Sequence, residues 1–223
     1  MTKDVLHKIK AAMFDLDGTL FDSIGIWTKI DEMFLAARGR VPTPEYKHSI
    51  AAMSNAECAK FTIEYYNLDD TPEALIAEWH DMARREYSSV ELMPHAKEYL
   101  QSVHSRGIKI YALSSLDKEL AILALKHSGI YELFSGLIFA GQGGLSKNKP
   151  EIYLHAAKTA EAAPSACVMF DDIIRATCAA KEAGFISVAV RNEKSYDDGL
   201  TADSDSADYF VSSFAAAPEL YFD

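Results

Sequence analysis

Two aspartates stand two residues apart in the segment MFDLDGT, directly after a short apolar run. On a strand, residues two apart share a face, so Asp15 and Asp17 can point the same way. Gly18 follows them, permits a turn and can bring backbone N–H groups near an anion. A surface turn is the simpler alternative, because Asp and Gly are common in turns. An EF-hand does not fit, since Ile24 would occupy the place of its bidentate Glu.

A second acidic pair, Asp171 and Asp172, ends another apolar run in the segment VMFDDI. Two pairs of carboxylates at one edge of a sheet would repel each other strongly. A hard divalent cation would remove this repulsion, and oxygen ligands with water suit Mg²⁺. The sequence therefore predicts a magnesium site built from both pairs, with a surface turn as the alternative for the second.

Buried strands are needed to bring the two pairs together. Near-continuous apolar runs predict strands buried on both faces at 11–14, 108–113, 166–170 and 186–190, with weaker candidates at 137–140 and 208–211. Helical spacing lies between them, at 95–106, 117–128, 150–162 and 174–183. This alternation predicts a doubly wound α/β fold with a parallel sheet and right-handed crossovers. The carboxyl ends of all its strands share one edge, where open α/β sheets bind ligands.

The connection between the first two strands is longer than a crossover needs. The helix at 95–106 is sufficient for it, so residues 22–92 are surplus to the sheet. Apolar residues recur at helical spacing within this segment, and VPTPE and DDTPE place a proline near two helix starts. We therefore expect a core domain formed by residues 1–21 and 93–223, and an inserted all-helical domain, 22–92, above the carboxyl ends of the strands.

Composition narrows the class of partner. The chain has 223 residues, with 22 Lys and Arg against 33 Asp and Glu, a net charge of −11. This charge disfavours nucleic-acid binding. No segment approaches the ~20 apolar residues of a membrane span, and the three cysteines lack CxxC spacing, which favours a reducing compartment. We expect a cytoplasmic monomer that binds neither nucleic acid nor a membrane.

Four segments resemble, in order, the motifs of the haloacid dehalogenase-like (HAD) phosphohydrolases. They are FDLDGTLFDS, IYALSS, LSKNKPEIYLHAA and CVMFDDIIRATCAAKEAG, and the likeness extends from about residue 10 to 190. The helical insert is placed as in members with a cap between the first two motifs, such as phosphoglycolate phosphatase and β-phosphoglucomutase. The resemblance implies a Rossmann-like core with a helical cap domain, Mg²⁺ as cofactor and a small phosphorylated metabolite as partner.

The resemblance also implies roles for the acidic residues. Asp15 matches the nucleophile that forms an aspartyl phosphate, and Asp17 matches the general acid and base, whose backbone carbonyl is a metal ligand. Because a halide leaving group needs no proton, the presence of Asp17 favours phosphoryl chemistry over dehalogenation. Asp172 matches the direct metal ligand and Asp171 a neighbour that ligates directly or through water. Ile173 stands where the family often has Ser, which leaves the detailed metal geometry open.

Phosphate-binding residues follow from the second and third motifs. Ser114, with Ser115 beside it, matches the hydroxyl that binds phosphate oxygens, together with backbone N–H groups such as that of Gly18. A helix cap is the alternative reading of this serine pair. Lys147 matches the lysine of the family pattern KPxPxxY, but Asn148 replaces its first proline, so Lys149 stays a second candidate.

These inferences predict a Mg²⁺-dependent phosphatase that hydrolyses a small phosphate monoester. A phosphomutase of the β-phosphoglucomutase kind would use the same residues, and a phosphonate hydrolase would need a cap lysine, for which Lys29, Lys47 and Lys60 are candidates. A non-catalytic binding module would be expected to lack a central group, and none is missing. The segment GQGG at 141–144 does not have the context of a dinucleotide loop, and TADSDSAD at 201–208 is expected to be a solvated loop.

Overall fold

The computed structural model describes residues 4–50, 53, 55–141, 144–195 and 205–222. The chain divides into two compact units: Met1–Ile24 with Val90–Asp223, and Gly25–Ser89. The sequence predicts that the inserted segment spans residues 22–92. Gln142, Gly143 and the first half of the acidic stretch, 201–204, lie outside the described residues.

A six-stranded parallel sheet forms the first unit. Its strands are β2 (Ala11–Phe14), β3 (Lys109–Ser114), β4 (Gly136–Phe139), β5 (Cys167–Asp171), β6 (Ile186–Val190) and β7 (Tyr209–Val211). They lie in the order β4-β3-β2-β5-β6-β7, that of a doubly wound sheet. In this register Met13 pairs with Tyr111 on one side and Met169 on the other. The predicted fold class is confirmed, including the two weaker strands.

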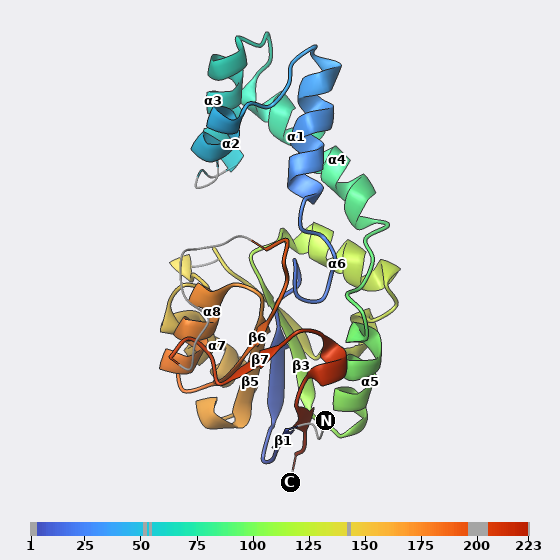
Figure 1. Cartoon of the computed structure of the whole chain (residues 1–223), viewed down its shortest axis with the longest axis vertical. Coiled ribbons are helices and arrows are strands. Elements are labelled where there is room, and N and C mark those ends of the chain that lie inside the picture. Colours follow the sequence, from blue (N-terminus) through green and yellow to red (C-terminus); the bar gives the residue numbers. More distant parts are fainter. Residues whose placement is uncertain (1–3, 51–52, 54, 142–143, 196–204, 223) are drawn as a thin grey trace. The chain divides into compact units, whose positions relative to one another are not determined.

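Four helices cover the sheet, two on each face. Figure 1 shows α5 (Ala96–Ser105) and α6 (Lys118–His127) against one face and α7 (Pro150–Thr159) and α8 (Ile174–Glu182) against the other. Alternating residues of β2 serve the two cores: Met13 belongs to the cluster with α7 and α8, while Phe14 stacks on Phe170 at 4.6 Å between ring centroids. The central strand is therefore apolar throughout because both of its faces are buried.

In the described part of this unit, three short 3₁₀ helices complete the connections: η1 (Tyr131–Leu133), η3 (Pro164–Ala166) and η4 (Phe214–Ala216). The helix expected at 150–162 ends at Thr159, because Glu161 adopts a left-handed backbone with φ of 56°. A second, two-stranded sheet was not predicted. It pairs β1 (Val5–Leu6) with β8 (Glu219–Leu220) in parallel.

The chain leaves and re-enters this first unit through a pair of adjoining segments. The Asp22 N–H donates to the Glu91 carbonyl at 3.0 Å, and the Met93 N–H donates to the Leu20 carbonyl at 2.8 Å. Between them, Phe21 and Leu92 form an antiparallel bridge. The two ends of the insert are thus hydrogen-bonded to each other inside the first unit.

The second unit is entirely helical in its described part. It contains α1 (Ile26–Ala37), α2 (Pro44–Ile50), α3 (Asn55–Tyr66) and α4 (Pro72–Tyr87), with prolines at the two helix starts that the sequence indicated. Phe34 and Trp79 pack edge to face at 5.5 Å between α1 and α4. Arg38 donates to both Asp70 and Glu78, at 2.8–3.2 Å, and so ties the end of α1 to α4 and the loop before it. No helix in the described part of the chain is both long and apolar enough to cross a membrane.

Candidate active site

Three aspartates meet at the centre of the carboxyl edge of the sheet. Asp15 follows β2, Asp171 ends β5 and Asp172 is the next residue; β2 and β5 are neighbours at the point where the strand order reverses. Each contributes an oxygen to a group whose members lie within 4.8 Å of one another. Their exposed fractions are 4%, 0% and 9%. The position is the crevice in which doubly wound sheets bind ligands.

The Asp17 side chain lies outside this group. Ser23 Oγ donates to Asp17 Oδ1 at 2.5 Å. Strand β2 ends at Phe14, so Asp15 and Asp17 both lie beyond it, where the alternation of strand faces no longer applies. Three carboxylates, not four, therefore form the cluster, and Asp17 stands beside it.

Gly18 makes a tight turn possible next to the cluster. Its φ is 79°, and a Cβ at this position would collide with the carboxylate of Asp172. Its N–H donates to the Phe21 carbonyl at 3.0 Å. Because a trans peptide points its C=O opposite to its N–H, the Asp17 carbonyl points away from Phe21. This N–H is already used within the turn, and the phosphate-binding role of Gly18 stays a prediction.

Lys147 reaches into the cluster. Its Nζ lies 2.6 Å from Asp15 Oδ1 and 2.7 Å from Asp171 Oδ2. Burial lowers the pKa of Lys147, but Asp15 and Asp171 outweigh it, and the pKa lies above its ordinary value. Lys149 is exposed and immediately precedes α7. Of the two candidate lysines, the structure brings Lys147 to Asp15.

The loop that carries Lys147 is held without the missing proline. The buried Tyr153, on α7, donates its hydroxyl to the Lys147 carbonyl at 2.8 Å. Ser146 accepts from two backbone N–H groups, Asn148 to its hydroxyl at 3.2 Å and Lys149 to its carbonyl at 3.1 Å. A serine turn and a tyrosine anchor thus replace the rigidity that a proline would give.

The charge balance of the cluster fits a divalent cation. Three carboxylates face one ammonium, which leaves two negative charges when all are ionised. Burial raises the pKa of Asp171, against the pull of Lys147, and burial with the charge of Asp15 raises the pKa of Asp172 to about 6. Asp171 Oδ2 is paired with the Lys147 ammonium at 2.7 Å, which leaves the carboxylate of Asp172 without a cationic partner in the cluster. A bound cation would offset the remaining negative charge and lower both pKa values.

Ser114 ends β3 at the same edge and is 1% exposed. Its Oγ accepts from the Leu116 N–H at 3.0 Å, while Ser115 is exposed. Neither serine caps the following helix, because the cap of α6 is Asp117, whose Oδ1 accepts from the Glu119 N–H at 2.8 Å. The alternative reading of the serine pair as a helix cap is therefore wrong.

Comparison with known proteins matches residues 9–184 to the family model of the haloacid dehalogenase-like hydrolases. The chain belongs to this family. A Drosophila melanogaster protein named a probable pseudouridine-5'-phosphatase is 27% identical over 203 residues, 85% of each chain. A phosphorylated carbohydrates phosphatase of Thermotoga maritima is 25% identical over 177 residues, 79% of this chain and 82% of that one. A T. maritima structure assigned as a β-phosphoglucomutase is 25% identical, with a TM-score of 0.77 over 91% of this chain and 94% of that one.

Sequence reasoning missed several residues that this HAD-like hydrolase places around its acidic cluster. Thr19 Oγ1 donates to Asp172 Oδ1 at 2.9 Å, and Ser195 Oγ donates to Asp172 Oδ2. Asn192 Nδ2 donates to the Gly18 carbonyl at 2.8 Å. Thr19 lies within the segment FDLDGTLFDS, but its contact with Asp172 was not predicted. Asn192 and Ser195 follow β6, and the rule that all parallel strands end at one edge could have drawn attention to them.

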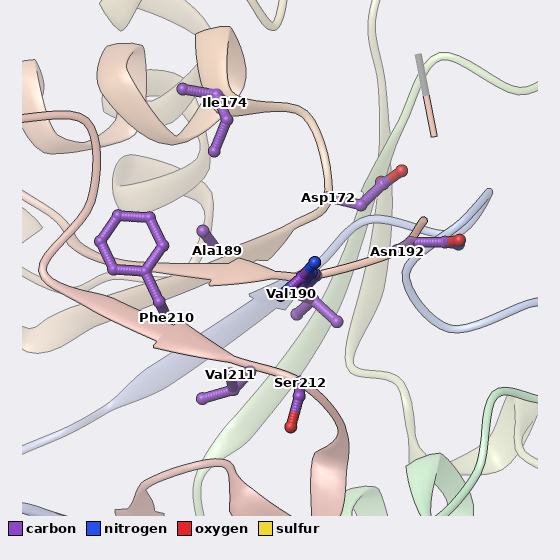
Figure 2. Close-up of a pocket in the computed structure, with 9 residues that line it drawn as sticks. Asp172, Ile174, Ala189, Val190, Asn192, Phe210, Val211 and Ser212 are labelled. Atoms are coloured by element: carbon purple, nitrogen blue, oxygen red, sulfur yellow. The ribbon is translucent and has the colours of Figure 1, made fainter. Parts of the chain in front are cut away.

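A cavity opens beside Asp172 at the ends of β6 and β7. It has a volume of about 570 Å³ and is lined by both apolar and polar side chains of the first unit. Figure 2 shows Asp172 and Asn192 at one end of it and Phe210 at the other. Asp172 is the member of the carboxylate cluster that lines this cavity.

Proposed function

We propose that the protein is a Mg²⁺-dependent phosphatase that hydrolyses a small phosphate monoester through an aspartyl phosphate on Asp15. The observation that carries this proposal is the contact of Lys147 Nζ with Asp15 Oδ1, at 2.6 Å, within a cluster of three carboxylates. A carboxylate needs no base to act as a nucleophile, but an anionic phosphate must be drawn to it by positive charge. The phosphatase names of the relatives agree with this chemistry.

The metal would be held by Asp15, Asp172 and the backbone carbonyl of Asp17, with Asp171 as a direct or water-bridged ligand. Asp172 is the stronger candidate, because Asp171 already has the Lys147 ammonium 2.7 Å away. When bound, Mg²⁺ would act as a Lewis acid that neutralises charge on the transferring phosphoryl group.

The first half of the reaction forms the covalent intermediate. An Asp15 carboxylate oxygen attacks phosphorus, the bond from phosphorus to the ester oxygen breaks, and Asp17 gives its proton to the leaving alkoxide. In the second half, Asp17 takes a proton from water, the water oxygen attacks phosphorus, and the Asp15–phosphorus bond breaks. Inorganic phosphate leaves, and both aspartates return to their starting states.

The remaining site residues bind the phosphate oxygens. Ser114, at the end of β3, offers its hydroxyl, and Ser115 offers a further donor. Phosphate binding by the Gly18 N–H would require it to leave the Phe21 carbonyl, to which it now donates. Lys147 offsets the charge on Asp15 and on the phosphoryl group, and a charge placed there acts mainly in the transition state. The small exposed fraction of the Lys147 side chain, 11%, and the hydrogen bond from Tyr153 to the Lys147 carbonyl support this role.

The helical unit, Gly25–Ser89, is proposed as the cap domain that selects the substrate. The match of family members with a cap at this point of the chain supports the assignment. We propose a small phosphorylated metabolite as the substrate, and a cytoplasmic monomer as the working form.

A panel of phosphate monoesters tests the proposal. Purified protein should release inorganic phosphate with Mg²⁺ and lose this activity in excess chelator, with Asp15→Asn as the inactive control. Full activity in chelator, with no metal found by elemental analysis, would refute the metal-dependent mechanism.

The β-phosphoglucomutase assignment of one structural relative favours phosphoryl transfer to sugar as the second candidate. Phosphorus NMR on a hexose 1-phosphate separates the two functions. A phosphatase gives inorganic phosphate, and a mutase gives the 6-phosphate.

A further inference from the structure

The turn that follows β6 contacts the acidic site at three places. Asn192 reaches the Gly18 carbonyl, Lys194 reaches Asp22, and Ser195 reaches Asp172. We propose that Asn192 and Ser195 are positioning residues for the divalent-cation site, acting through Gly18 and Asp172. The inference rests on the proposed function, because it names the parts of the chain that hold the metal ligands in place.

Ser195 and Thr19 together fix the carboxylate of Asp172. Thr19 donates to one carboxylate oxygen at 2.9 Å and Ser195 donates to the other. A carboxylate held at both oxygens cannot rotate without losing a hydrogen bond. Each oxygen of an ionised carboxylate has about two acceptor sites, so each keeps one for a cation. The two hydroxyls therefore orient Asp172 without blocking it.

Asn192 fixes the turn that carries Asp17. Its amide nitrogen donates to the Gly18 carbonyl at 2.8 Å, and its amide oxygen accepts from the Lys194 N–H at 3.0 Å. The amide plane is thus held at both ends. The N–H of Gly18 is bound to Phe21 at 3.0 Å. With both peptide groups of Gly18 held, the direction of the Asp17 carbonyl is set as well.

The contacts of Asn192 and Ser195 act on two groups that touch each other, Gly18 and the carboxylate of Asp172. Gly18 lies against the carboxylate of Asp172, so closely that no Cβ would fit between them. A shift of the turn would therefore move two proposed ligands, the Asp17 carbonyl and Asp172, relative to each other. Groups that orient metal ligands typically change metal affinity by about 10–100-fold when removed.

The contact of Lys194 with Asp22 is more exposed to solvent than those of Asn192 and Ser195. Its Nζ lies 2.8 Å from Asp22 Oδ1, but the two side chains are 61% and 42% exposed. Exposed pairs of this kind contribute little. We assign no positioning role to Lys194.

Direct measurement of Mg²⁺ binding tests the inference without turnover. Isothermal titration of chelator-stripped protein with Mg²⁺, in the absence of substrate, should show a Kd raised about tenfold in Ser195→Ala and in Asn192→Ala. Ser195→Thr keeps the hydroxyl and should restore binding to within about threefold. Ser212→Ala is the matched control: Ser212 is exposed, lines the same cavity and points away from Asp172 in Figure 2. Its Kd should stay at the wild-type value.

The outcomes separate the inference from the function on which it rests. If the wild-type protein binds Mg²⁺ and both alanine variants bind it equally well, the positioning role is refuted and the metal site stands. If the wild-type protein binds no Mg²⁺, the proposed function fails first. Asn192→Asp keeps the shape of the side chain but loses the donor to Gly18, so it should weaken Mg²⁺ binding as Asn192→Ala does. Thermal midpoints equal to that of the wild type exclude a folding defect in these variants. If the Asn192 variants do not fold, the result for Ser195→Ala decides the inference.

Discussion

At the scale of single residues, Lys147 has the most consequential contacts. Its side chain is 11% exposed, and its Nζ lies within 2.7 Å of two carboxylates, whose negative charge it partly offsets. Removing one member of a buried charge group leaves the others unpaired, an effect that exceeds the value of the contact itself. The neighbouring Lys149 is exposed and serves as a natural comparison.

Lys147→Ala is expected to lower kcat/KM by several orders of magnitude, and Lys149→Ala by about tenfold or less. The reason is that Lys147 contacts the proposed nucleophile, whereas Lys149 precedes the α7 helix. Steady-state kinetics on the best substrate of the monoester panel measure both values. The opposite order of effects would show that Lys149 is the phosphate-binding lysine.

Asp15→Asn and Asp17→Asn should fail in different ways. Without Asp15 no phosphoenzyme can form, and turnover should fall to background. Asp17→Asn keeps the nucleophile but loses the acid and the base, so an activated aryl or acyl phosphate should still phosphorylate it. The phosphoenzyme should then persist, because its hydrolysis lacks a base.

Rapid-quench mass spectrometry detects the added phosphoryl mass and maps it to a residue. An adduct on the Asp15→Asn protein, or one mapped to Asp17 in the wild type, would contradict the mechanism.

The sequence identified the aspartates of the cluster and the lysine that contacts them, but not the side chains that hydrogen-bond to these aspartates. Asp171, Asp172 and Lys147 could be predicted because each stands in a motif or at a strand end. The contact between Ser195 and Asp172 could not, since it joins loops after two different strands and has no local pattern. The exclusion of Asp17 from the carboxylate cluster depends on where β2 ends, and the apolar pattern does not fix that residue.

At the scale of elements, burial on both faces made the sheet predictable. The strands β2, β5 and β6 read as apolar runs because helices cover both sides. The β1 and β8 strands could not be found in the same way, since two residues each carry no periodicity. Their pairing depends on the two ends of the chain meeting in space.

The helix α1 contains a side chain, Asp31, that makes the free energy of unfolding depend on pH. Burial raises the pKa of Asp31, on α1, to about 6, against the attraction of Lys47 and with a smaller push from Glu32. An acid with a higher pKa in the folded state binds more protons when folded. Stability from this group is therefore greatest below its unfolded pKa of 3.8 and is lost as the pH rises through about 6.

Asp31→Asn removes this loss and should stabilise the protein at pH 7.5 by about 1–2 kcal/mol, with the gain vanishing toward pH 4. Urea unfolding of wild type and variant at a series of pH values measures it. Asp81→Asn, at an exposed position of α4, is the control for the loss of one negative charge from the helical unit. A gain that is equal at pH 4 and pH 7.5 would exclude a titrating origin.

At the scale of the whole molecule, a metal bound at the acidic cluster would stabilise the folded protein. All its members belong to the sheet unit, so a ligand that binds them stabilises that unit as folded. The net charge of −11 adds to the advantage of taking up a cation.

Mg²⁺ at about 100 times its Kd should raise the free energy of unfolding by about 2.7 kcal/mol, or the thermal midpoint by roughly 5–10 °C. Differential scanning calorimetry with Mg²⁺ and with chelator measures the shift. Asp172→Asn should abolish most of it and Asp171→Asn less, because Lys147 already pairs with Asp171. A larger loss in Asp171→Asn would exchange the two proposed ligand roles.

The two hydrogen-bonded segments that flank the helical insert have a consequence for inheritance. Leu20 to Asp22 are held to Glu91, Leu92 and Met93, just where the helical insert begins and ends. Because these contacts join the two ends of the insert, we expect a change in its length to leave the position of Asp15 unchanged. A lineage could lengthen, shorten or replace the helical insert while the geometry around Asp15 passes unchanged from ancestor to descendant.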